Sequence, residues 1–204
     1  MGNNIKNSYA GIYVFEGIDN VGKTTIIQAL QEKIYKEIGC DCTIIAFPGK
    51  EARSLGALVY DVHHHTKKYF DFPINAASLQ LLHVAAHIDL IQRKLIEEYS
   101  SSKIILMDRF WWSTYAYGLA GGLERDVLHT VLAPELVYWE KINIRKIFLL
   151  ERKDREIDYE TDKDILIRQN YSDLAKEESK CQIINNDGRL EETINKVFIN
   201  ILGA

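Results

Sequence analysis

A run of eight residues bounded by glycine has the composition to hold a chain of phosphates. Gly17-Ile18-Asp19-Asn20-Val21-Gly22-Lys23-Thr24 satisfies the spacing of the Walker A motif. It follows a short apolar stretch at residues 12–15 and precedes apolar residues at helical spacing, namely Ile27, Leu30, Ile34 and Ile38. The run therefore lies between a predicted strand and a predicted helix, the context in which this motif binds nucleotides. A turn that matches the spacing by chance is the alternative.

The residues of this phosphate loop have distinct chemical uses. Its glycines let the backbone wrap around phosphate oxygens, and the amides at the helix start direct partial positive charge at the anion. Lys23 adds a full positive charge for the outer phosphates, and the Thr24 hydroxyl is the expected Mg²⁺ ligand. The motif alone does not separate a kinase from a GTPase or a motor, but the Asn-Lys-x-Asp pattern of guanine specificity is absent. We predict ATP binding by Gly17, Asn20, Val21, Gly22, Lys23, Thr24 and Thr25.

A second group of chemical interest is Asp108-Arg109-Phe110, which follows the apolar run at residues 103–107. Open α/β sheets bind their ligands at this carboxyl edge. An aspartate there can order Mg²⁺ or accept a proton, and an arginine can hold an anionic acceptor through two parallel hydrogen bonds. We predict that Asp108 and Arg109 are catalytic together with Lys23, and that Asp108 shares the metal with Thr24. A purely structural Asp-Arg pair is the alternative.

The elements that must position these groups can be predicted from apolar patterning. Five short apolar runs predict strands at residues 12–15, 43–47, 103–107, 147–150 and 182–184. Helical spacing predicts helices after Lys23, over 55–62, over 81–95 and over 194–201, and a capping box at Thr161 and Asp164 begins another that runs through Leu174. Alternating strands and helices imply an α/β fold, a parallel sheet with helices on both faces.

Length and composition limit the possible functions. The 204 residues fit a single domain over 1–204, and the net charge of −4 argues against a polynucleotide partner. The three cysteines show neither zinc-site nor disulfide spacing, which favours a reducing cytosol. The first ten residues lack the apolar stretch of a signal peptide, and no run approaches the roughly 20 residues of a membrane span. We therefore expect a cytoplasmic protein that does not contact the membrane.

In their order along the chain, these motifs resemble the thymidylate kinase family. Phe15-Glu16-Gly17-Ile18-Asp19 followed by Gly22-Lys23-Thr24-Thr25 is similar to that family's phosphate loop. Phe47-Pro48-Gly49 is similar to the turn after its second strand. The family's Asp-Arg-Tyr segment is matched by Asp108-Arg109-Phe110 with Ser113, Ala116 and Tyr117, and the helix after its lid by Arg168, Tyr171 and Leu174-Ala175. The resemblance covers nearly the whole chain.

The resemblance implies a fold, an activity and residue roles. The fold is that of a P-loop NTPase with a five-stranded parallel sheet, commonly assembled as a homodimer. The activity is ATP-dependent, Mg²⁺-supported phosphoryl transfer to a nucleoside monophosphate, converting dTMP to dTDP. Asp19 would approach the acceptor sugar, Arg109 would bind the acceptor phosphate, and Tyr117 would lie against the deoxyribose and disfavour a 2′-hydroxyl. Phe47 and Pro48 would complete the acceptor site.

The lid implied by the resemblance is assigned to residues 151–162, which are crowded with charge. Some family members carry a catalytic arginine inside the phosphate loop, but Asn20 or Val21 stands there in this chain. Negative charge on the transferred phosphoryl group would then be met from the lid. The candidates are Arg152, Lys153 and Arg155, of which we assign Arg152 and Arg155 as catalytic. A solvated charged loop is the alternative.

The resemblance is weakest where the family reads the acceptor base. His83 and His87 stand in place of a stacking phenylalanine and a base-reading arginine, one helical turn apart. We expect base contacts from both; packing is the second interpretation and metal binding the third. His63-His64-His65 is expected to be a solvated helix end. The family's arginine before the Phe-Pro turn and its glutamine after the tyrosine are Ala46 and Gly118 here.

These departures leave other functions open. The acceptor could be another deoxynucleotide, a deoxynucleoside or a modified base rather than dTMP. A nucleotide-binding regulator without efficient turnover is the alternative outside enzymes, although Asp108, Arg109 and a cationic lid argue against it, because a binder needs no acceptor site.

Overall fold

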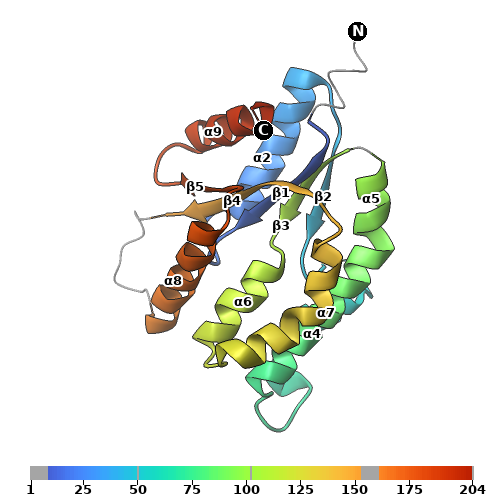
Figure 1. Cartoon of the computed structure of the whole chain (residues 1–204), viewed down its shortest axis with the longest axis vertical. Coiled ribbons are helices and arrows are strands. Elements are labelled where there is room, and N and C mark those ends of the chain that lie inside the picture. The colour runs from blue at the N-terminus through green and yellow to red at the C-terminus, as the bar shows by residue number, and fades with distance from the viewer. Residues whose placement is uncertain (1–8, 50, 102, 153–160, 204) are drawn as a thin grey trace.

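A computed structural model of the chain describes residues 9–49, 51–101, 103–152 and 161–203. At its centre is a five-stranded sheet in the order β2-β3-β1-β4-β5, with every neighbouring pair parallel (Figure 1). All five predicted strands are confirmed, and their bounds are Gly11–Glu16 (β1), Cys42–Ala46 (β2), Ile104–Asp108 (β3), Ile144–Glu151 (β4) and Cys181–Asn185 (β5).

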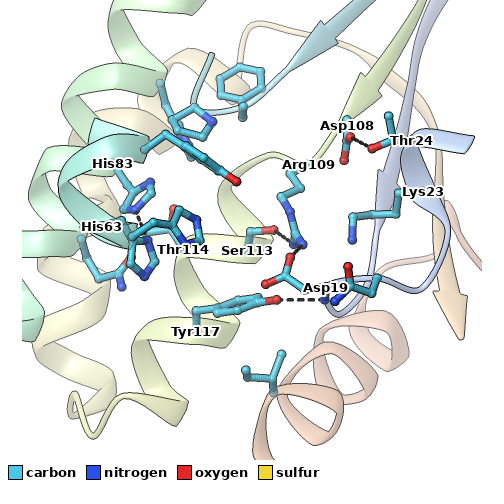
Figure 2. Close-up of a pocket in the computed structure, with 18 of the residues that line it drawn as sticks. Asp19, Lys23, Thr24, His63, His83, Asp108, Arg109, Ser113, Thr114 and Tyr117 are labelled. Atoms are coloured by element: carbon cyan, nitrogen blue, oxygen red, sulfur yellow. Dashed lines mark hydrogen bonds and ion pairs between the residues drawn. The ribbon is translucent and has the colours of Figure 1, made fainter. Parts of the chain in front are cut away.

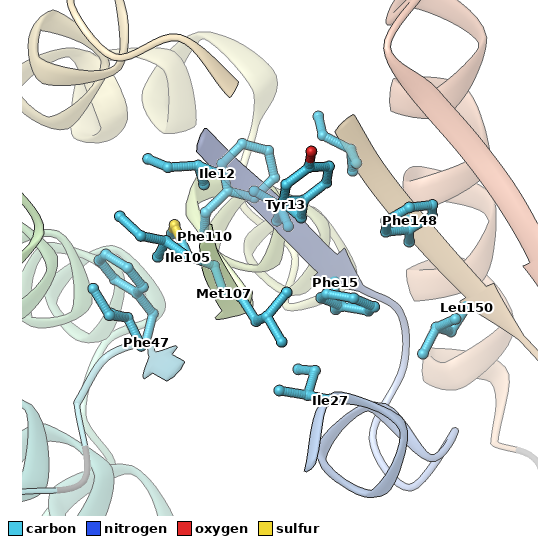
Figure 3. Packing of buried hydrophobic residues seen from close by; sticks show 14 of the residues in the cluster. Ile12, Tyr13, Phe15, Ile27, Phe47, Ile105, Met107, Phe110, Phe148 and Leu150 are labelled. Carbon is cyan, nitrogen blue, oxygen red and sulfur yellow. The ribbon is translucent and has the colours of Figure 1, made fainter. Parts of the chain in front are cut away.

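Helices cover both faces of the sheet, as predicted (Figure 1). The helix α2 (Lys23–Ile38) packs against α9 (Leu190–Leu202), while α6 (Trp111–Ala120) packs against α8 (Asp162–Glu177). This two-sided cover explains why the central strands read as continuous apolar runs. Residues 12–15 of β1 are fully buried, and Phe15 lies in the main core beside Phe148 and Ile27 (Figure 3).

The remaining helices lie between β2 and β4 in the chain. They are α3 (Leu55–His64), η1 (Thr66–Lys68), α4 (Ala76–Leu90), the π-helical segment η2 (Ile91–Leu95), α5 (Ile96–Ser100) and α7 (Arg125–Trp139). The predicted helices after Lys23 and over 55–62, 81–95 and 194–201 are confirmed. The capping box is confirmed too, since Thr161 caps α8 and exchanges hydrogen bonds with Asp164.

No helix was predicted over α6 or α7, and this is a correction. The signal was present in α7, which buries positions spaced three and four apart: Leu128, Val131, Leu132, Glu135 and Trp139. A smaller apolar cluster, formed by Val84, Tyr115, Leu128, Val131 and Leu132, joins α4, α6 and α7. These helices therefore pack together beside the carboxyl edge of the sheet.

The register of the sheet brings the two predicted chemical groups together. Phe15 of β1 pairs with Asp108 of β3, and the amide of Arg109 donates to the carbonyl of Phe15 at 3.0 Å. The phosphate loop and Asp108-Arg109 therefore leave the sheet side by side, as expected for adjacent parallel strands.

Two predictions remain open here. Most of the lid segment at 151–162, including Lys153 and Arg155, lies outside the described residues. The single domain over 1–204 stays a prediction. Where the structure describes the chain, no helix combines the length and apolar character needed to cross a membrane.

Candidate functional site

The phosphate loop has the backbone conformation that its glycines predict. Gly17 and Gly22 have φ angles of 136° and 102°, in the region that favours glycine. A Cβ at Gly17 would lie 2.5 Å from the Leu150 carbonyl oxygen, and one at Gly22 would lie 2.7 Å from Nδ2 of Asn186. The same Asn186 amide donates to the Val21 carbonyl at 2.9 Å. The loop is thus held from β4 and from the chain after β5, and both glycines are required.

Lys23 begins α2 and is folded back against the loop. Its ammonium donates to the carbonyls of Gly17 at 2.9 Å and Ile18 at 2.8 Å, and only 6% of the residue is exposed. Burial, together with the Arg109 guanidinium, lowers the pKa of Lys23 to about 8. The cation is therefore held where the phosphates of a nucleotide would lie.

Thr24 and Asp108 form the predicted metal pair. The Thr24 hydroxyl donates to Oδ2 of Asp108 at 2.9 Å, and the aspartate is 7% exposed. Within the described ranges, no three His, Cys, Asp or Glu side chains form a group that could hold a metal. Two hard oxygen ligands fit Mg²⁺, which keeps several waters and takes its other ligands from phosphates.

Arg109 lies in the site, facing the same space as Lys23 and Asp19 (Figure 2). Its backbone φ is 72°, which is unusual for a residue with a side chain. The guanidinium lies 5.5 Å from the centre of the Tyr117 ring. It donates to four groups: the Gly17 carbonyl (3.1 Å), Ser113 Oγ (2.8 Å), the Tyr171 hydroxyl (3.1 Å) and Asp19 Oδ1 (2.5 Å). These contacts fix a cation that could grip an anionic acceptor.

Glu16 organises this part of the site, and the sequence analysis did not consider it. Its carboxylate is fully buried and accepts hydrogen bonds from the Phe110 amide (2.9 Å), the Ser113 hydroxyl (2.8 Å) and the Tyr171 hydroxyl (2.9 Å). Burial raises the pKa of Glu16, while the guanidinium of Arg109, 3.8 Å away, acts in the opposite direction. Its position at the end of β1, directly before the phosphate loop, is the sequence feature that could have indicated its role in the site.

Asp19 and Tyr117 meet at the mouth of the site. The Asp19 amide donates to the Tyr117 hydroxyl at 3.2 Å. Burial would raise the pKa of Asp19, but Arg109 and Lys23 outweigh it and lower that pKa. Because Asp19 stays charged and points toward Arg109, the predicted acceptor residues form one connected group (Figure 2).

A cavity of about 820 Å³ joins these groups to α3, α4 and α6. Every predicted acceptor residue lines it: Asp19, Phe47, Pro48, His83, His87, Arg109 and Tyr117. So do five of the predicted ATP residues, Asn20, Gly22, Lys23, Thr24 and Thr25, together with Asp108. Gly17 and Val21 shape the loop from behind it. Arg152 is exposed directly after β4 and does not line the cavity, and Arg155 lies outside the described residues.

The Phe47-Pro48 turn is pressed tightly against α3. Its peptide bond is cis, and a Cβ at Gly56 would lie 2.0 Å from the Pro48 carbonyl oxygen. Phe47 is 3% exposed and meets the His87 ring edge-on, with ring centres 4.7 Å apart. The turn therefore connects α3 and α4 at the wall of the cavity.

The two histidines of α4 each have a polar partner. Nδ1 of His87 is 3.0 Å from both carboxylate oxygens of Glu135, which is fully buried and also accepts from Trp139 Nε1 at 2.9 Å. Nε2 of His83 is 3.0 Å from Nδ1 of His63. Burial and the neighbouring histidines lower the pKa of His83 to about 3. His83 is thus neutral. Glu135, the partner of His87, was not found by the sequence analysis.

The expectation of a solvated helix end at His63-His64-His65 is wrong for His63, which is only half-exposed, whereas His64 and His65 are exposed. His63 and His64 line the cavity, because α3 packs beside α4 and directs its last turn toward His83 (Figure 2). His65 lies away from the cavity, and its Nδ1 is 2.7 Å from Asp61. Further lining residues that the sequence analysis missed are Tyr60, Gln80, Ser113, Thr114, Lys163, Asp164 and Ile167.

Comparisons with known proteins agree with this geometry. The family model described as thymidylate kinase matches residues 15–197. A probable thymidylate kinase of Sulfolobus acidocaldarius is 26% identical over 92% of this chain and 94% of its own length. A thymidylate kinase of Caldanaerobacter subterraneus is 29% identical over 80% of each chain. The crystal structure of a thymidylate kinase from Ehrlichia chaffeensis superposes with a TM-score of 0.72, at 21% identity, over 94% of this chain and 98% of that one, which supports the fold.

Proposed function

Because the chain belongs to the thymidylate kinase family, it is a nucleoside monophosphate kinase, and we propose that it transfers the terminal phosphate of ATP to dTMP to give dTDP. One observation carries the proposal. The Thr24 hydroxyl on the phosphate loop is hydrogen-bonded to Asp108, next to the anion-binding Arg109, and all three line one cavity. A donor phosphate and an acceptor phosphate bound there would lie next to each other.

On the donor side, the phosphate loop binds the triphosphate of ATP. Backbone amides of the loop would donate to its oxygens, and Lys23 would leave its two carbonyl partners for the outer phosphates. Thr24 and Asp108 would hold Mg²⁺, which neutralises charge on the phosphates when bound.

On the acceptor side, Arg109 binds the phosphate of the monophosphate in two-pronged fashion. To do so, its guanidinium gives up the hydrogen bond to Asp19 and binds the substrate phosphate instead. The hydrogen bonds to Ser113 and Tyr171 keep the guanidinium in place. Tyr117 lies against the sugar, where its ring excludes a 2′-hydroxyl. The Phe47-Pro48 turn closes the far wall beside His87.

The transferred phosphoryl group needs cations around its oxygens. Lys23 supplies one, and we assign Arg152 and Arg155 of the lid segment as the others. Lys163, at the start of α8, already lines the cavity and is a further candidate. Transfer then depends mainly on position and electrostatics, because phosphoryl transfer requires little covalent help from the protein.

The histidines support one second candidate, the same transfer to a different nucleotide or deoxynucleoside. His83 and His87 replace the residues that the family resemblance implies for reading thymine. Both line the cavity, and base contact is the role we assign to them. A base with another pattern of donors and acceptors could suit them better than thymine.

We also assign a homodimer and a cytoplasmic location, which the family resemblance implies. The helix α3 offers exposed apolar surface for a second copy, since Leu58 is 50% exposed. Light scattering on the purified chain would measure the mass; a monomer at all concentrations would contradict the dimer.

The function is tested by coupling ADP release to an absorbance change in the presence of different acceptors. We expect ATP turnover to require an acceptor, with dTMP preferred over dUMP, dCMP, dGMP and thymidine. Arg109→Lys should keep the positive charge but lose the two-pronged geometry, lowering kcat/KM for the acceptor by about 100-fold. Preference for another acceptor would select the second candidate. Turnover that no acceptor stimulates would leave only a nucleotide-binding regulator.

A further inference from the structure

One face of α4 is turned toward the cavity. Gln80, His83 and His87 are spaced three and seven positions apart, which places them on one side of a helix, and all three line the cavity. Gln80 is 6% exposed, so the protein encloses most of its side chain. It lies one turn before His83 along this face.

Among the described residues, no side-chain or backbone group forms a hydrogen bond with the side-chain amide of Gln80, whereas every fully buried side-chain nitrogen and oxygen there has a partner. The amide atoms must therefore be reached from the cavity. Thr114 on α6 is in the same situation, 4% exposed with a hydroxyl that has no partner in the described part of the chain.

Polar groups that face a cavity without a protein partner contribute little to the stability of the folded state, so an apolar side chain would serve the fold equally well at either position. A binding site keeps such groups because they discriminate between substrates that can pair with them and substrates that cannot. Two such groups, Gln80 on α4 and Thr114 on α6, indicate that this wall of the cavity binds a ligand through hydrogen bonds.

The neighbour of Gln80 on the opposite helix is Gly118, which follows Tyr117. A Cβ at Gly118 would lie 2.8 Å from Leu128 and 3.6 Å from Cγ of Gln80. The family resemblance places a glutamine at position 118, where a side chain would require Leu128 to shift. The Gln80 side chain instead enters the same region from α4.

We propose that Gln80, assisted by Thr114, determines acceptor specificity by pairing with the polar edge of the acceptor base. The inference rests on the proposed kinase function. An amide offers a donor and an acceptor side by side, so its oxygen can accept from a ring N–H while its nitrogen donates to the adjacent carbonyl. Thymine presents that pair at N3 and O4, and flipped-out bases are read through this edge.

The test measures kcat/KM for dTMP, dUMP and dCMP, KM for ATP, and the melting temperature. Gln80→Leu removes both hydrogen bonds at similar volume and should lower kcat/KM for dTMP about 10- to 100-fold, with KM for ATP unchanged. Because the amide is unpaired in the free protein, the melting temperature should stay the same or rise. Thr114→Val should lower kcat/KM for dTMP by a smaller factor.

Gln80→Glu tests the pairing itself. A carboxylate only accepts, so one oxygen can still accept from N3–H of thymine while the other repels O4. We expect kcat/KM for dTMP to fall at least about 10-fold, with KM for ATP unchanged. Gln169→Leu is the matched control, since Gln169 is exposed on α8, bonded to Asp173 and outside the cavity.

The outcomes separate this inference from the proposed function. If the unmodified protein turns over dTMP and all three substitutions leave the acceptor profile unchanged, the inference is wrong and the kinase function stands. A fall in melting temperature with no change in acceptor preference would make Gln80 a structural residue. If the unmodified protein uses no nucleotide acceptor at all, the proposed function fails, and the inference fails with it.

Discussion

The hydroxyl of Thr24 and the carboxylate of Asp108 are 2.9 Å apart, although 84 positions separate them in the chain. Their proximity follows from the parallel pairing of β1 with β3, which brings the ends of both strands to one edge of the sheet. A pair of oxygen ligands in this position has a measurable consequence for metal dependence.

Asp108→Asn should lower kcat by about 10²–10³-fold and raise the Mg²⁺ concentration needed for half-maximal activity, because an amide oxygen is a weaker ligand than a carboxylate. A Mg²⁺ titration at saturating ATP measures both. Thr24→Ser keeps the hydroxyl and should shift the titration little. An unchanged Mg²⁺ dependence in Asp108→Asn would remove this residue from the metal site.

The pKa of about 8 at Lys23 predicts a pH dependence. In the free enzyme Lys23 loses its proton as pH rises through 8, so kcat/KM for ATP should fall above that pH. Bound ATP favours the charged amine, so kcat at saturating ATP should hold to higher pH. The Arg109 guanidinium opposes the charged form of the amine, while the nearby carboxyl groups of Asp108, Glu16 and Asp19 favour it. Steady-state rates from pH 6.5 to 9.5 measure both profiles, and an alkaline limb that persists in Lys23→Arg would assign the titration to another group.

The same lowered pKa makes Lys23 costly to the fold. Below pH 8 both folded and unfolded chains carry the proton, and the buried charge lowers the free energy of unfolding by up to about 3 kcal/mol. Between pH 8 and 10.5 the unfolded chain binds more protons, so this penalty fades as pH rises. Lys23→Met should therefore raise the urea midpoint at pH 7 while abolishing most turnover. A lower midpoint would contradict the penalty.

Glu135→Leu should destabilise the fold by about 2–4 kcal/mol. It leaves two buried donors, Nδ1 of His87 and Nε1 of Trp139, without their acceptor. Urea unfolding measures the loss, and Glu135→Gln should recover part of it because its oxygen still accepts. Glu140→Ala, an exposed change at the end of the same helix, should stay within about 0.5 kcal/mol. Equal effects at both positions would contradict the role of the buried pair.

Gly56→Ala should displace the Phe47-Pro48 turn. The new methyl group would meet the Pro48 carbonyl at 2.0 Å, and the backbone on both sides must shift. We expect a loss of about 1–3 kcal/mol in unfolding free energy and a higher KM for dTMP, with KM for ATP unchanged. At Gly203 the nearest atom to an added Cβ is 3.6 Å away, so Gly203→Ala is the control. A normal KM for dTMP in Gly56→Ala would separate this turn from the acceptor site.

The local parts of the site were predictable because their signals are local. The phosphate loop combines required glycines with a strand before it and a helix after it, and the capping box at Thr161 needs only four residues to be recognised. The strands were predictable for a similar reason, since a strand buried on both faces reads as one apolar run.

The contacts between distant segments were not predictable from the pattern of residues. Glu135 contacts His87, 48 positions away in the chain, and His63 contacts His83, 20 positions away. Neither spacing corresponds to a sequence pattern that predicts a contact. Both pairs depend on how α3 and α7 pack beside α4, which is settled by the small apolar cluster and by the Phe47-Pro48 turn. Gln80 shares a helix face with His83, so its position could have been inferred once that helix was placed.

The hydrogen bonds at the sheet edge also determine which parts of the molecule can move. The Phe47 amide donates to the Asp108 carbonyl at 2.9 Å, and the Arg109 amide donates to the Phe15 carbonyl at 3.0 Å. Three substrate-binding segments are thereby joined by backbone hydrogen bonds at one edge of the sheet. We therefore expect closure around a substrate to move the peripheral helices, while these three segments keep their positions relative to one another. On heating, the sites for the donor and acceptor phosphates should consequently stay next to each other until the sheet itself unfolds.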